Sequence, residues 1–463
     1  VIYPTAGRGY RSIAGRGCRP IARAAAVERL CGFEPVDGFL FIRQRDSLRM
    51  KRLPLFVVVG LVTTVLVVGV AAPATDTAGV AAADSSPPGS ATATIQPIAS
   101  TMATADRWSV SLAQLDSDPE AVPGMTNVLW IPAETIDRSS VDQQHADLGP
   151  AAGFDTDATT DRLITRTIER ELEASADVER ATRLAEEVDA VAAGVEGLET
   201  RERAATREFG TGQTTATEYV TELAAIHLAA DRLRDRAEML ESQAEPLDSS
   251  PVSADRFRRI EYDLRMLEGP VRAHAADILR GATPPNRVLV ETGDEAITLA
   301  AVDDDQYLRE VQRRGLRGET AGEVSADRAI EIIQEEYPIL WDRGTSWSSD
   351  GPGSVVMVGV EFSGGELRSF IDGPTEQRFI EHQRLPLSMV TTGETTTKEQ
   401  DGLNVTADQS YAGGPLRLTV TDADTGEPID ATVTVGQNGA ESQRIGTTDE
   451  AGTLWLLSPR GPF

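Results

Sequence analysis

Apolar residues recur at alternating spacings of three and four positions in three successive segments of the chain. This spacing places them on one face of an α-helix, so it predicts three amphipathic helices. The three apolar seams are Leu184, Val188, Val191, Val195 and Leu198; then Tyr219, Leu223, Ile226, Ala230, Leu233, Ala237 and Leu240; then Phe257, Ile260, Leu264, Leu267, Val271, His274 and Ile278. Because the connections are short, the helices are expected to run antiparallel as a long three-helix bundle or coiled coil.

Helix-breaking and helix-capping residues set the limits of these helices. The first is expected from about residue 160 to 208. Gly194 and Gly197 predict a kink or a break in it, since each glycine costs about 1 kcal/mol relative to alanine. Ser253 and Ser325 are the expected N-caps of the third helix and of a later helix.

After residue 284 the apolar pattern changes to that of a small α+β domain. Short apolar runs on either side of Gly293-Asp294 and of Gly364-Gly365 predict two β-hairpins. Helices are also expected in this domain, at residues 305–314, 326–341 and 375–384. Upstream of the bundle, residues 127–132 predict a short strand that ends at Pro132.

From Leu403 onward the pattern is that of an all-β domain. Residues 416–421 and 431–435 predict two strands joined by a turn at 422–428. A further strand is expected after Phe463, so the sandwich is expected to be incomplete at that point. The five threonines within residues 391–397 predict a linker before this domain.

The fold class is therefore a multidomain α+β protein with a helical bundle, a small α+β domain and a C-terminal β-sandwich. In chain order the expected segments are an upstream extension at 1–49, a signal peptide or N-terminal membrane anchor at 50–74, a flexible Ala/Thr/Ser/Pro linker at 75–105, a short strand-containing segment at 106–156, the helical bundle at 157–282, the α+β domain at 283–390, a Thr-rich linker at 391–402 and the β-sandwich at 403–463.

A secretory signal is predicted near the N-terminus. Met50-Lys51-Arg52 precedes an apolar run at 53–70 and a small-residue stretch at 71–74, which is the order of a signal peptide. The run of 18 residues is at the lower limit for spanning a bilayer, so a cleaved signal and a retained anchor both remain open. Translation is expected to begin at Met50, and a genuine cytoplasmic extension before an anchor is the alternative.

Charge and cysteine content argue against some partners and some kinds of site. The chain has 73 acidic and 44 basic residues, and Lys51 and Lys398 are its only lysines. Downstream of Arg52 the balance is 69 acidic against 33 basic residues, which is typical of a protein adapted to high salt and argues against a nucleic-acid partner. Both cysteines, Cys18 and Cys31, lie before Met50, so the exported part is expected to have no disulfide and no cysteine-based metal site.

The motifs of the common hydrolases and nucleotide-binding proteins are absent from the sequence. It has no His-Glu-x-x-His pair, no Gly-x-Ser-x-Gly elbow and no Gly-Lys dipeptide for a P-loop. Four histidines are present, of which His274 lies on the third seam and could meet His227 across the bundle; a structural role is the simpler interpretation. No catalytic residue and no cofactor are therefore predicted.

Two further features concern surface chemistry. The weak calcium candidates are Asp422, Asp424 and Asp430, with a second acidic run at residues 303–305, since Ca²⁺ takes oxygen ligands. A turn is the simpler interpretation of the first set, because Gly426 comes one place too early for an EF-type loop, and a helix N-terminus is the simpler interpretation of the second. Asn404-Val405-Thr406 is the single Asn-x-Ser/Thr sequon, so Asn404 is a glycosylation candidate, and an unmodified surface residue is the alternative.

Two parts of the chain resemble known families. The C-terminal turns and strands, Val420-Thr421-Asp422, Thr425-Gly426-Glu427-Pro428-Ile429, Ala431-Thr432-Val433 and Thr448-Asp449 before Gly452, are similar to the transthyretin-like or carboxypeptidase-regulatory-like β-sandwich of surface proteins. Residues 126–240, with Arg201-Glu202-Arg203-Ala204-Ala205, Phe209-Gly210-Thr211-Gly212 and Glu218-Tyr219-Val220-Thr221-Glu222-Leu223-Ala224, resemble a helical domain of unknown function in exported haloarchaeal proteins. The second resemblance implies architecture and compartment, and no activity.

We therefore expect a noncatalytic, envelope-associated surface protein of a halophile that acts in spacing or protein interaction outside the membrane. Its partner is expected to be an unidentified protein or envelope component, with membrane contact through 53–70 if that segment is uncleaved. The oligomeric state stays open. The alternative is an extracellular enzyme or protease inhibitor, with 283–390 as the active part, because residues 326–341 and the following hairpin loosely resemble peptidase-propeptide modules.

Overall fold

The computed structural model describes residues 128–247, 250–400, 402–435 and 443–458. The expected upstream extension, signal segment and first linker lie outside the described residues. Among the described helices, none is both long enough and apolar enough to span a membrane.

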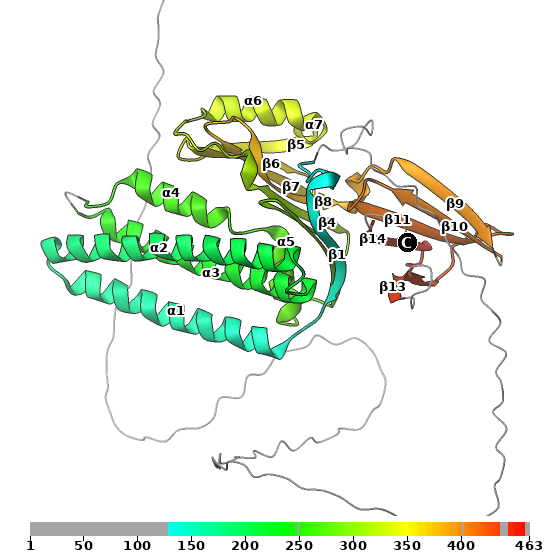
Figure 1. Cartoon of the computed structure of the whole chain (residues 1–463), viewed down its shortest axis with the longest axis horizontal. Coiled ribbons are helices and arrows are strands. Elements are labelled where there is room, and N and C mark those ends of the chain that lie inside the picture. The colour runs from blue at the N-terminus through cyan, green and yellow to red at the C-terminus, as the bar shows by residue number, and fades with distance from the viewer. Residues whose placement is uncertain (1–127, 248–249, 401, 436–442, 459–463) are drawn as a thin grey trace, which may run out of the picture. The chain divides into compact units, whose positions relative to one another are not determined.

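The first two predicted seams lie on long helices. Helices α1 (Leu148–Ala174), α2 (Asp177–Gly210) and α3 (Ala216–Ala244) run side by side (Figure 1). The α2 seam is buried throughout, and the α3 seam is buried except for the half-buried Leu233. A capping box starts α3, because the Thr215 hydroxyl accepts from the Glu218 amide while the Glu218 carboxylate accepts from the Thr215 amide.

The expected kink at Gly194 and Gly197 is absent, and α2 runs through both glycines. The chain breaks instead at Ser175, between α1 and α2, where the backbone becomes extended. A Cβ at Gly194 would lie 3.0 Å from Leu233 Cδ1. Gly194 therefore lets α3 approach α2 closely, and its role is packing between helices rather than interruption of one helix.

The third seam is divided between two helices. α4 (Ala254–Arg265) follows Ser253, and α5 (Pro270–Leu279) follows Gly269. Proline at the first position of α5 explains the break, since its fixed φ suits a helix start and its missing N–H prevents continuation of α4. The seam residues from Phe257 to Val271 lie in the core of the bundle, and His274 and Ile278 are also buried.

An antiparallel sheet of eight strands lies against these helices. Its strands in chain order are β1 (Ile136–Gln144), β2 (Asn286–Gly293), β3 (Ala296–Asp303), β4 (Gln306–Arg313), β5 (Gly344–Asp350), β6 (Val355–Phe362), β7 (Gly365–Asp372) and β8 (Arg378–Pro386). Their spatial order is β1-β2-β3-β4-β8-β7-β6-β5. The two predicted hairpins are β2–β3 and β6–β7, and both are confirmed.

Two of the expected helices in this region are strands. Residues 305–314 form β4 and residues 375–384 mostly form β8, and these strands pair with each other at the centre of the sheet. β4 is buried on both faces along almost its whole length, and β8 is buried on both faces from Arg378 to Glu381, so neither strand shows the polar and apolar alternation of a half-exposed strand. The acidic run at 303–305 is accordingly the β3–β4 turn, with Asp304 at φ 49°, and not a helix N-terminus.

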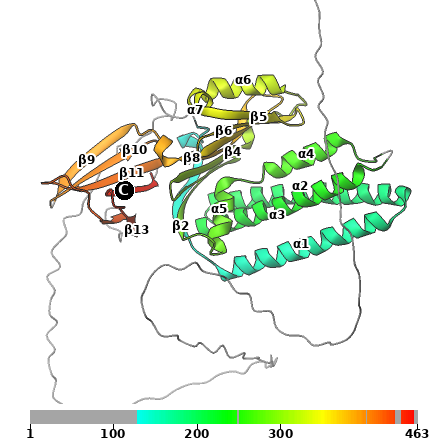
Figure 2. The ribbon, with the colours of Figure 1, turned by 180° about the vertical axis from the view of Figure 1, so that it is seen from behind.

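The expected helix at 326–341 is present as α6 (Ala326–Glu336) and α7 (Pro338–Arg343). Pro338 divides it, and the Ser325 hydroxyl accepts from the Arg328 amide at 3.2 Å, as an N-cap does. These helices cover the face of β6 opposite to the bundle, where Ile333, Leu340 and Val358 share one apolar core (Figure 2).

The expected strand at 127–132 is not a strand in its described part, residues 128–132. Val128, Leu129 and Ile131 are buried here. The backbone of Leu129 bonds to side chains instead of to another strand: its amide donates to Glu381 at 2.6 Å, and its carbonyl accepts from Arg309. The next segment supplies the missed edge strand β1, whose Gln144 lies opposite Asn286 of β2. The sheet thus includes residues from the expected strand-containing segment as well as from 283–390.

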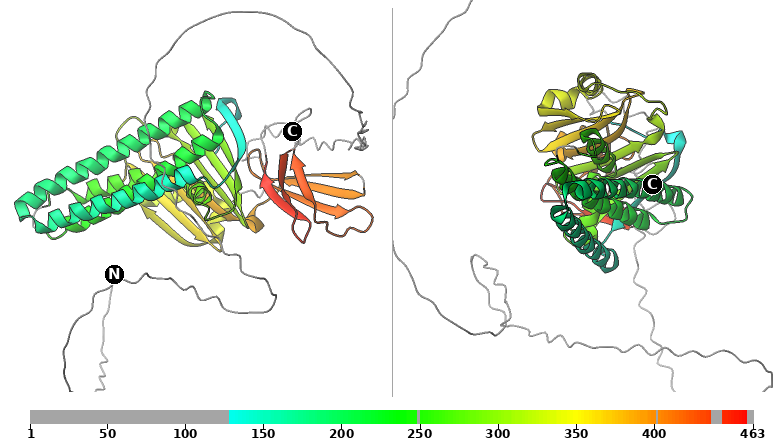
Figure 3. Two further views of the ribbon diagram at one scale, coloured as in Figure 1. Left: turned by 90° about the horizontal axis from the view of Figure 1, so that it is seen from below. Right: turned by 90° about the vertical axis from the view of Figure 1, so that its left-hand side faces the viewer.

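The C-terminal part is all β. A four-stranded sheet has the order β14-β11-β10-β9, formed by β9 (Glu394–Gln400), β10 (Leu403–Gln409), β11 (Pro415–Asp422) and β14 (Thr453–Leu457), and β12 (Thr432–Val435) pairs with β13 (Gln443–Thr447) (Figure 3). β9 occupies most of the Thr-rich segment that was expected to be a linker. Buried Tyr411 joins this part to the large sheet through a 2.9 Å hydroxyl–hydroxyl bond with Tyr307 of β4.

Candidate functional site

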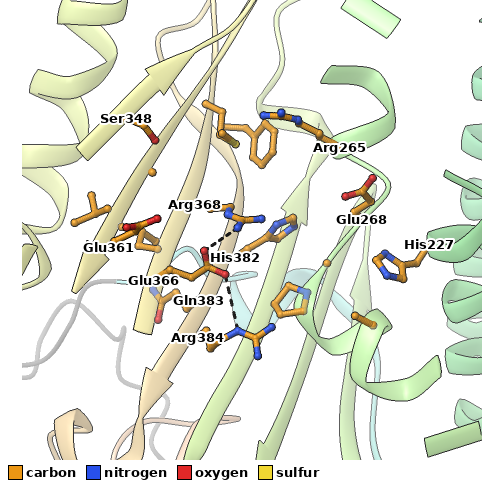
Figure 4. Close-up of a pocket in the computed structure, with 18 of the residues that line it drawn as sticks. His227, Arg265, Glu268, Ser348, Glu361, Glu366, Arg368, His382, Gln383 and Arg384 are labelled. Atoms are coloured by element: carbon orange, nitrogen blue, oxygen red, sulfur yellow. Dashed lines mark ion pairs between the residues drawn. The ribbon is translucent and has the colours of Figure 1, made fainter. Parts of the chain in front are cut away.

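A cleft of about 440 Å³ lies between the helices and the strands β5 to β8. The helix bundle packs its core against β2, β3 and β4, through Val290, Leu299 and Leu308, and leaves a hollow over the neighbouring strands. Side chains of α3, of the α4–α5 turn and of α5 form one wall, and β5, β6, β7 and β8 form the other (Figure 4).

Strand register places three charged residues and one histidine together on the sheet wall. Arg368 of β7 lies opposite His382 of β8, and Glu366 lies opposite Arg384. Because side chains two positions apart share a face of a strand, all four point to the bundle side. The Glu366 carboxylate contacts Arg368 at 2.8 Å and Arg384 at 3.9 Å (Figure 4).

The helix wall carries its own charge pairs. Arg234 of α3 bonds to Glu268, the residue before Gly269, and also lies 4.0 Å from Glu238. Arg265, at the end of α4, pairs with Glu261 at 2.5 Å. Burial raises the pKa of Glu268, and the nearby Arg234 opposes this effect. The wall therefore presents cations and anions in alternation.

Two histidines line the cleft from opposite walls. Burial lowers the pKa of His227 to about 4, with Arg272 adding to the effect, and burial lowers the pKa of His382 to about 3, with Arg272 and Arg368 adding to it. Both rings are therefore neutral near pH 7, and both are weak bases. The His227 Nδ1 atom is buried and has no hydrogen-bond partner among the described residues.

Every carboxylate that lines the cleft has a polar partner. Glu361 accepts from the Ser346 hydroxyl at 2.8 Å, and the carboxylates of Glu238, Glu268 and Glu366 lie beside arginines. This arrangement suits binding by charge pairing.

A buried ion network lies behind the helix wall. Arg272 of α5 bonds to Glu202 of α2 and, at 2.9 Å, to Glu310 of β4, so one guanidinium joins the bundle to the sheet. Burial raises the pKa of Glu310 to about 7, although Arg272 lowers it. The Glu310 carboxylate lies against Gly269, where a Cβ would come within 1.5 Å of Oε2.

A second buried network lies on the opposite face of the sheet. Glu381 is completely buried and accepts from Tyr337, Arg309 and Arg378 as well as from the Leu129 amide. Paired charges of this kind are costly to break, because removal of one partner leaves a buried charge without compensation. We interpret this network as structural, since it fixes residues 128 and 129 to the sheet.

The structure places Asp422 and Asp424 at the turn that follows β11, and it places Asp430 beyond that turn. Asp422 Oδ1 accepts from the Thr425 amide at 2.8 Å and from the Asp424 amide at 3.0 Å, so this carboxylate stabilises the β11 turn itself. Hydrogen bonding from Thr425 lowers the pKa of Asp422. Among the described residues, no group of three or more potential ligands is placed to hold a metal ion, the set with Asp430 included.

The remaining candidates lie apart from the cleft. Asn404 is on β10, paired with Thr421 of β11 and Glu399 of β9, and is partly exposed. His274 does not contact His227. Its Nε2 atom lies 3.0 Å from the side-chain Nδ2 atom of Asn286, and its Nδ1 atom lies 3.4 Å from the Asp303 carboxylate. Burial lowers the pKa of His274, against the effect of Asp303.

Sequence reasoning named His227 only as a possible neighbour of His274, and it did not predict the cleft. Glu366, Arg368, His382 and Arg384 are brought together by the pairing of β7 with β8, and His227 comes from a helix 155 positions before His382. The sequence contained one signal for them, the patterns Glu366-x-Arg368 and His382-x-Arg384. In a strand, residues two positions apart lie on the same face, so each pattern predicts two polar side chains on one face. The expectation of a helix at 375–384 concealed the second of these.

Comparison with known families assigns most of the chain. Residues 50–284 match a domain of unknown function, DUF7096, residues 288–391 match a family of unknown function, DUF7094, and residues 394–463 match the archaeal fibronectin-III type-like domain. No curated protein and no solved structure matches the chain.

These matches refine two expectations from the sequence. The C-terminal match supports an archaeal protein with a C-terminal β-sandwich, and the matched model is fibronectin-III type-like where the sequence resemblance named a transthyretin-like sandwich. The limit between the first two matches falls at the start of β2, inside one continuous sheet. Because residues 50–284 are more than half of the 463, the chain belongs to the family defined by the domain of unknown function DUF7096.

Proposed function

We propose that this chain is a noncatalytic, exported interaction protein of the envelope of a halophile, and that the cleft between helices and sheet is its contact site. The observation that carries the proposal is the lining of the cleft: it has arginines and carboxylates from both walls, each carboxylate already has a polar partner, and both histidines are neutral. Such a surface recognises a charged partner without proton transfer.

Two further features support export from the cell. In residues 50–74, basic residues are followed by an apolar run and then by small residues, which is the order of an export signal. Fibronectin-III-like sandwiches are also widespread in cell-surface proteins. The acidic excess and the near absence of lysine suit solubility in concentrated salt.

Site-specific photo-crosslinking of the full chain in its native cells tests this proposal. The crosslinking residue is placed at Ser348, which lines the cleft, and, as a control, at exposed Thr167 on α1. We expect a defined product with an envelope component from position 348 and not from position 167, in the membrane or medium fraction. A chain found only in the cytoplasm, or equal products from both positions, would contradict it.

The alternative of a protease inhibitor is tested with the same full chain. The segment 283–390 does not contain the whole sheet, because β1 comes from residues 136–144. Extracellular proteases of the same cells should therefore be incubated with the full chain. Dose-dependent inhibition would favour the alternative over the interaction protein.

A further inference from the structure

One carboxylate of the cleft is held between two arginines that reach well into solvent. Glu366 contacts Arg368 through one oxygen and Arg384 through the other (Figure 4). The Arg368 side chain is 53% exposed and that of Arg384 is 44% exposed, whereas that of Glu366 is 29% exposed. The two guanidinium groups thus form the outer part of this arrangement.

The arginines retain most of their donor capacity. A guanidinium has five N–H donors in a planar fork, and a carboxylate accepts two of them in a good bidentate pair. The 3.9 Å contact from Arg384 to Glu366 is longer than a hydrogen bond. Strand pairing fixes the backbone positions of both arginines, so a ligand carboxylate that replaces Glu366 needs no rearrangement of the sheet.

Cations of both walls contribute to the local potential, although arginines and glutamates line the cleft in equal number. Besides burial, Arg272 and Arg368 lower the pKa of His382, and Arg272 and Arg234 lower that of His227 against the effect of Asp231. Arg265 on the facing wall, which pairs with Glu261, borders the same space. The two exposed arginines of the sheet wall are therefore the cations best placed to meet a ligand anion.

We propose that the cleft binds a ligand carboxylate between Arg368 and Arg384, and that Glu366 occupies this place in the free protein. The proposal rests on the proposed function and names the chemistry of its contact site. The carboxylate comes either from a small dicarboxylic acid or from acidic side chains of a polypeptide. Glu366 identifies the chemistry, because a carboxylate already bridges the two guanidinium groups.

Titration calorimetry of the full chain, at a salt concentration where it is folded, tests this. The probes are glutarate, a triglutamate peptide and a neutral triglutamine peptide. We expect at least one acidic probe to bind and triglutamine not to bind. The double variant R368Q/R384Q should weaken binding by roughly tenfold or more, because two charge-assisted contacts are removed.

Two further variants complete the test. E366Q should bind the acidic probe several-fold more tightly, because the competing internal carboxylate is gone. R328Q is the matched control: Arg328 of α6 is 41% exposed and pairs with Glu376 away from the cleft, so binding should not change. Thermal melts of each variant verify that the fold is retained.

The outcomes separate the hypotheses. Binding of glutarate, alone or at least as tightly as the peptide, supports a small acid as the ligand, and binding of the peptide alone supports an acidic polypeptide. Absence of binding to both acids, or unchanged binding in R368Q/R384Q, would overturn the carboxylate site, and weaker binding by E366Q would overturn the place given to Glu366. If the acids fail while Ser348 still crosslinks to an envelope component, only the carboxylate proposal fails.

Discussion

Single residues show how closely the helices approach the sheet, and Gly269 is the clearest case. Its φ of −177° is ordinary extended backbone, so the reason for glycine is space. A side chain at this position would meet the buried Glu310 carboxylate, which Arg272 holds in place. Gly197 on α2 differs, because it is exposed and a Cβ there would meet nothing within 4 Å.

Alanine at these two glycines should therefore have opposite effects on the free energy of unfolding. Gly269→Ala should lower it by about 2 kcal/mol, since Glu310 must move and its pair with Arg272 weakens. Gly197→Ala should raise it by about 1 kcal/mol through helix propensity. Denaturant unfolding of both variants measures the difference, and equal effects would refute the close contact at Gly269.

His382 should make stability depend on pH. Its pKa is near 6.5 in the unfolded chain and about 3 in the folded protein, so the unfolded state takes up the proton first as pH falls. As far as His382 is concerned, the free energy of unfolding is therefore greatest above about pH 6.5, and it decreases as pH falls towards 3. Glu310 acts in the opposite sense, because its raised pKa favours the folded state as pH falls below about 7.

Comparison with His382→Leu isolates the histidine from these other groups. Between pH 7 and pH 5 the wild type should lose about 1–2 kcal/mol more than the variant. His145→Leu is the control, since His145 is exposed, and it should follow the wild type. Parallel pH profiles for wild type and His382→Leu would show that the ring is solvated in the folded protein.

At the scale of elements, the seam helices depend on burial of their apolar face. Leu264 of α4 is completely buried in the bundle core, whereas Leu163 of α1 is 64% exposed. Leu264→Asp should cost about 3–5 kcal/mol, because it removes packing and buries a carboxylate without a partner. Leu163→Asp should change the melting temperature little, and a similar loss in both variants would argue against the assigned faces.

The elements also show what local sequence can and cannot predict. The α2 and α3 seams were predictable, because spacings of three and four are read along one helix. β4 was not: Arg309 and Glu310 look like a solvated helix surface, but one pairs with Glu381 and the other with Arg272, both distant in sequence. Buried charges are acceptable only with such partners, which a local pattern does not contain.

The cleft escaped prediction for the same reason. Its walls combine α3 with β7 and β8, more than 120 positions later, and no spacing within either segment indicates the other. The division into α and β parts was predictable from the change of period near residue 284. The inclusion of β1 in the later sheet depends on pairing across the whole bundle.

At the scale of the whole molecule, charge should make folding depend on salt. The part after Arg52 has 69 acidic and 33 basic residues, and this self-repulsion destabilises a compact state when it is unscreened. The screening length is about 3 Å at 1 M salt and about 30 Å at 0.01 M. Salt also weakens surface pairs such as Arg201–Glu222, but exposed pairs contribute only about 0–1 kcal/mol each.

Residues 106–463 should therefore lose helical circular dichroism on dialysis from 3 M to 0.05 M KCl. The melting temperature should fall steadily as salt is removed. A melting temperature that is unchanged across this range would reject adaptation to concentrated salt. The same melts should be repeated in an uncharged osmolyte at matched water activity. An osmolyte stabilises by exclusion from the protein surface but does not screen charges, so this comparison separates the two effects.

The pairing of Gln144 with Asn286 has a consequence for how the chain folds. β1 and β2 are neighbours in the sheet, yet all of α1 to α5 lies between them, so the bundle is an insertion within a β-hairpin. Helical contacts are local and form early, whereas this strand pair must close a loop of about 140 residues. In pulsed hydrogen exchange during refolding, amides of α2 and α3 should gain protection before those of β1, and the edge of the sheet should be the last part to form.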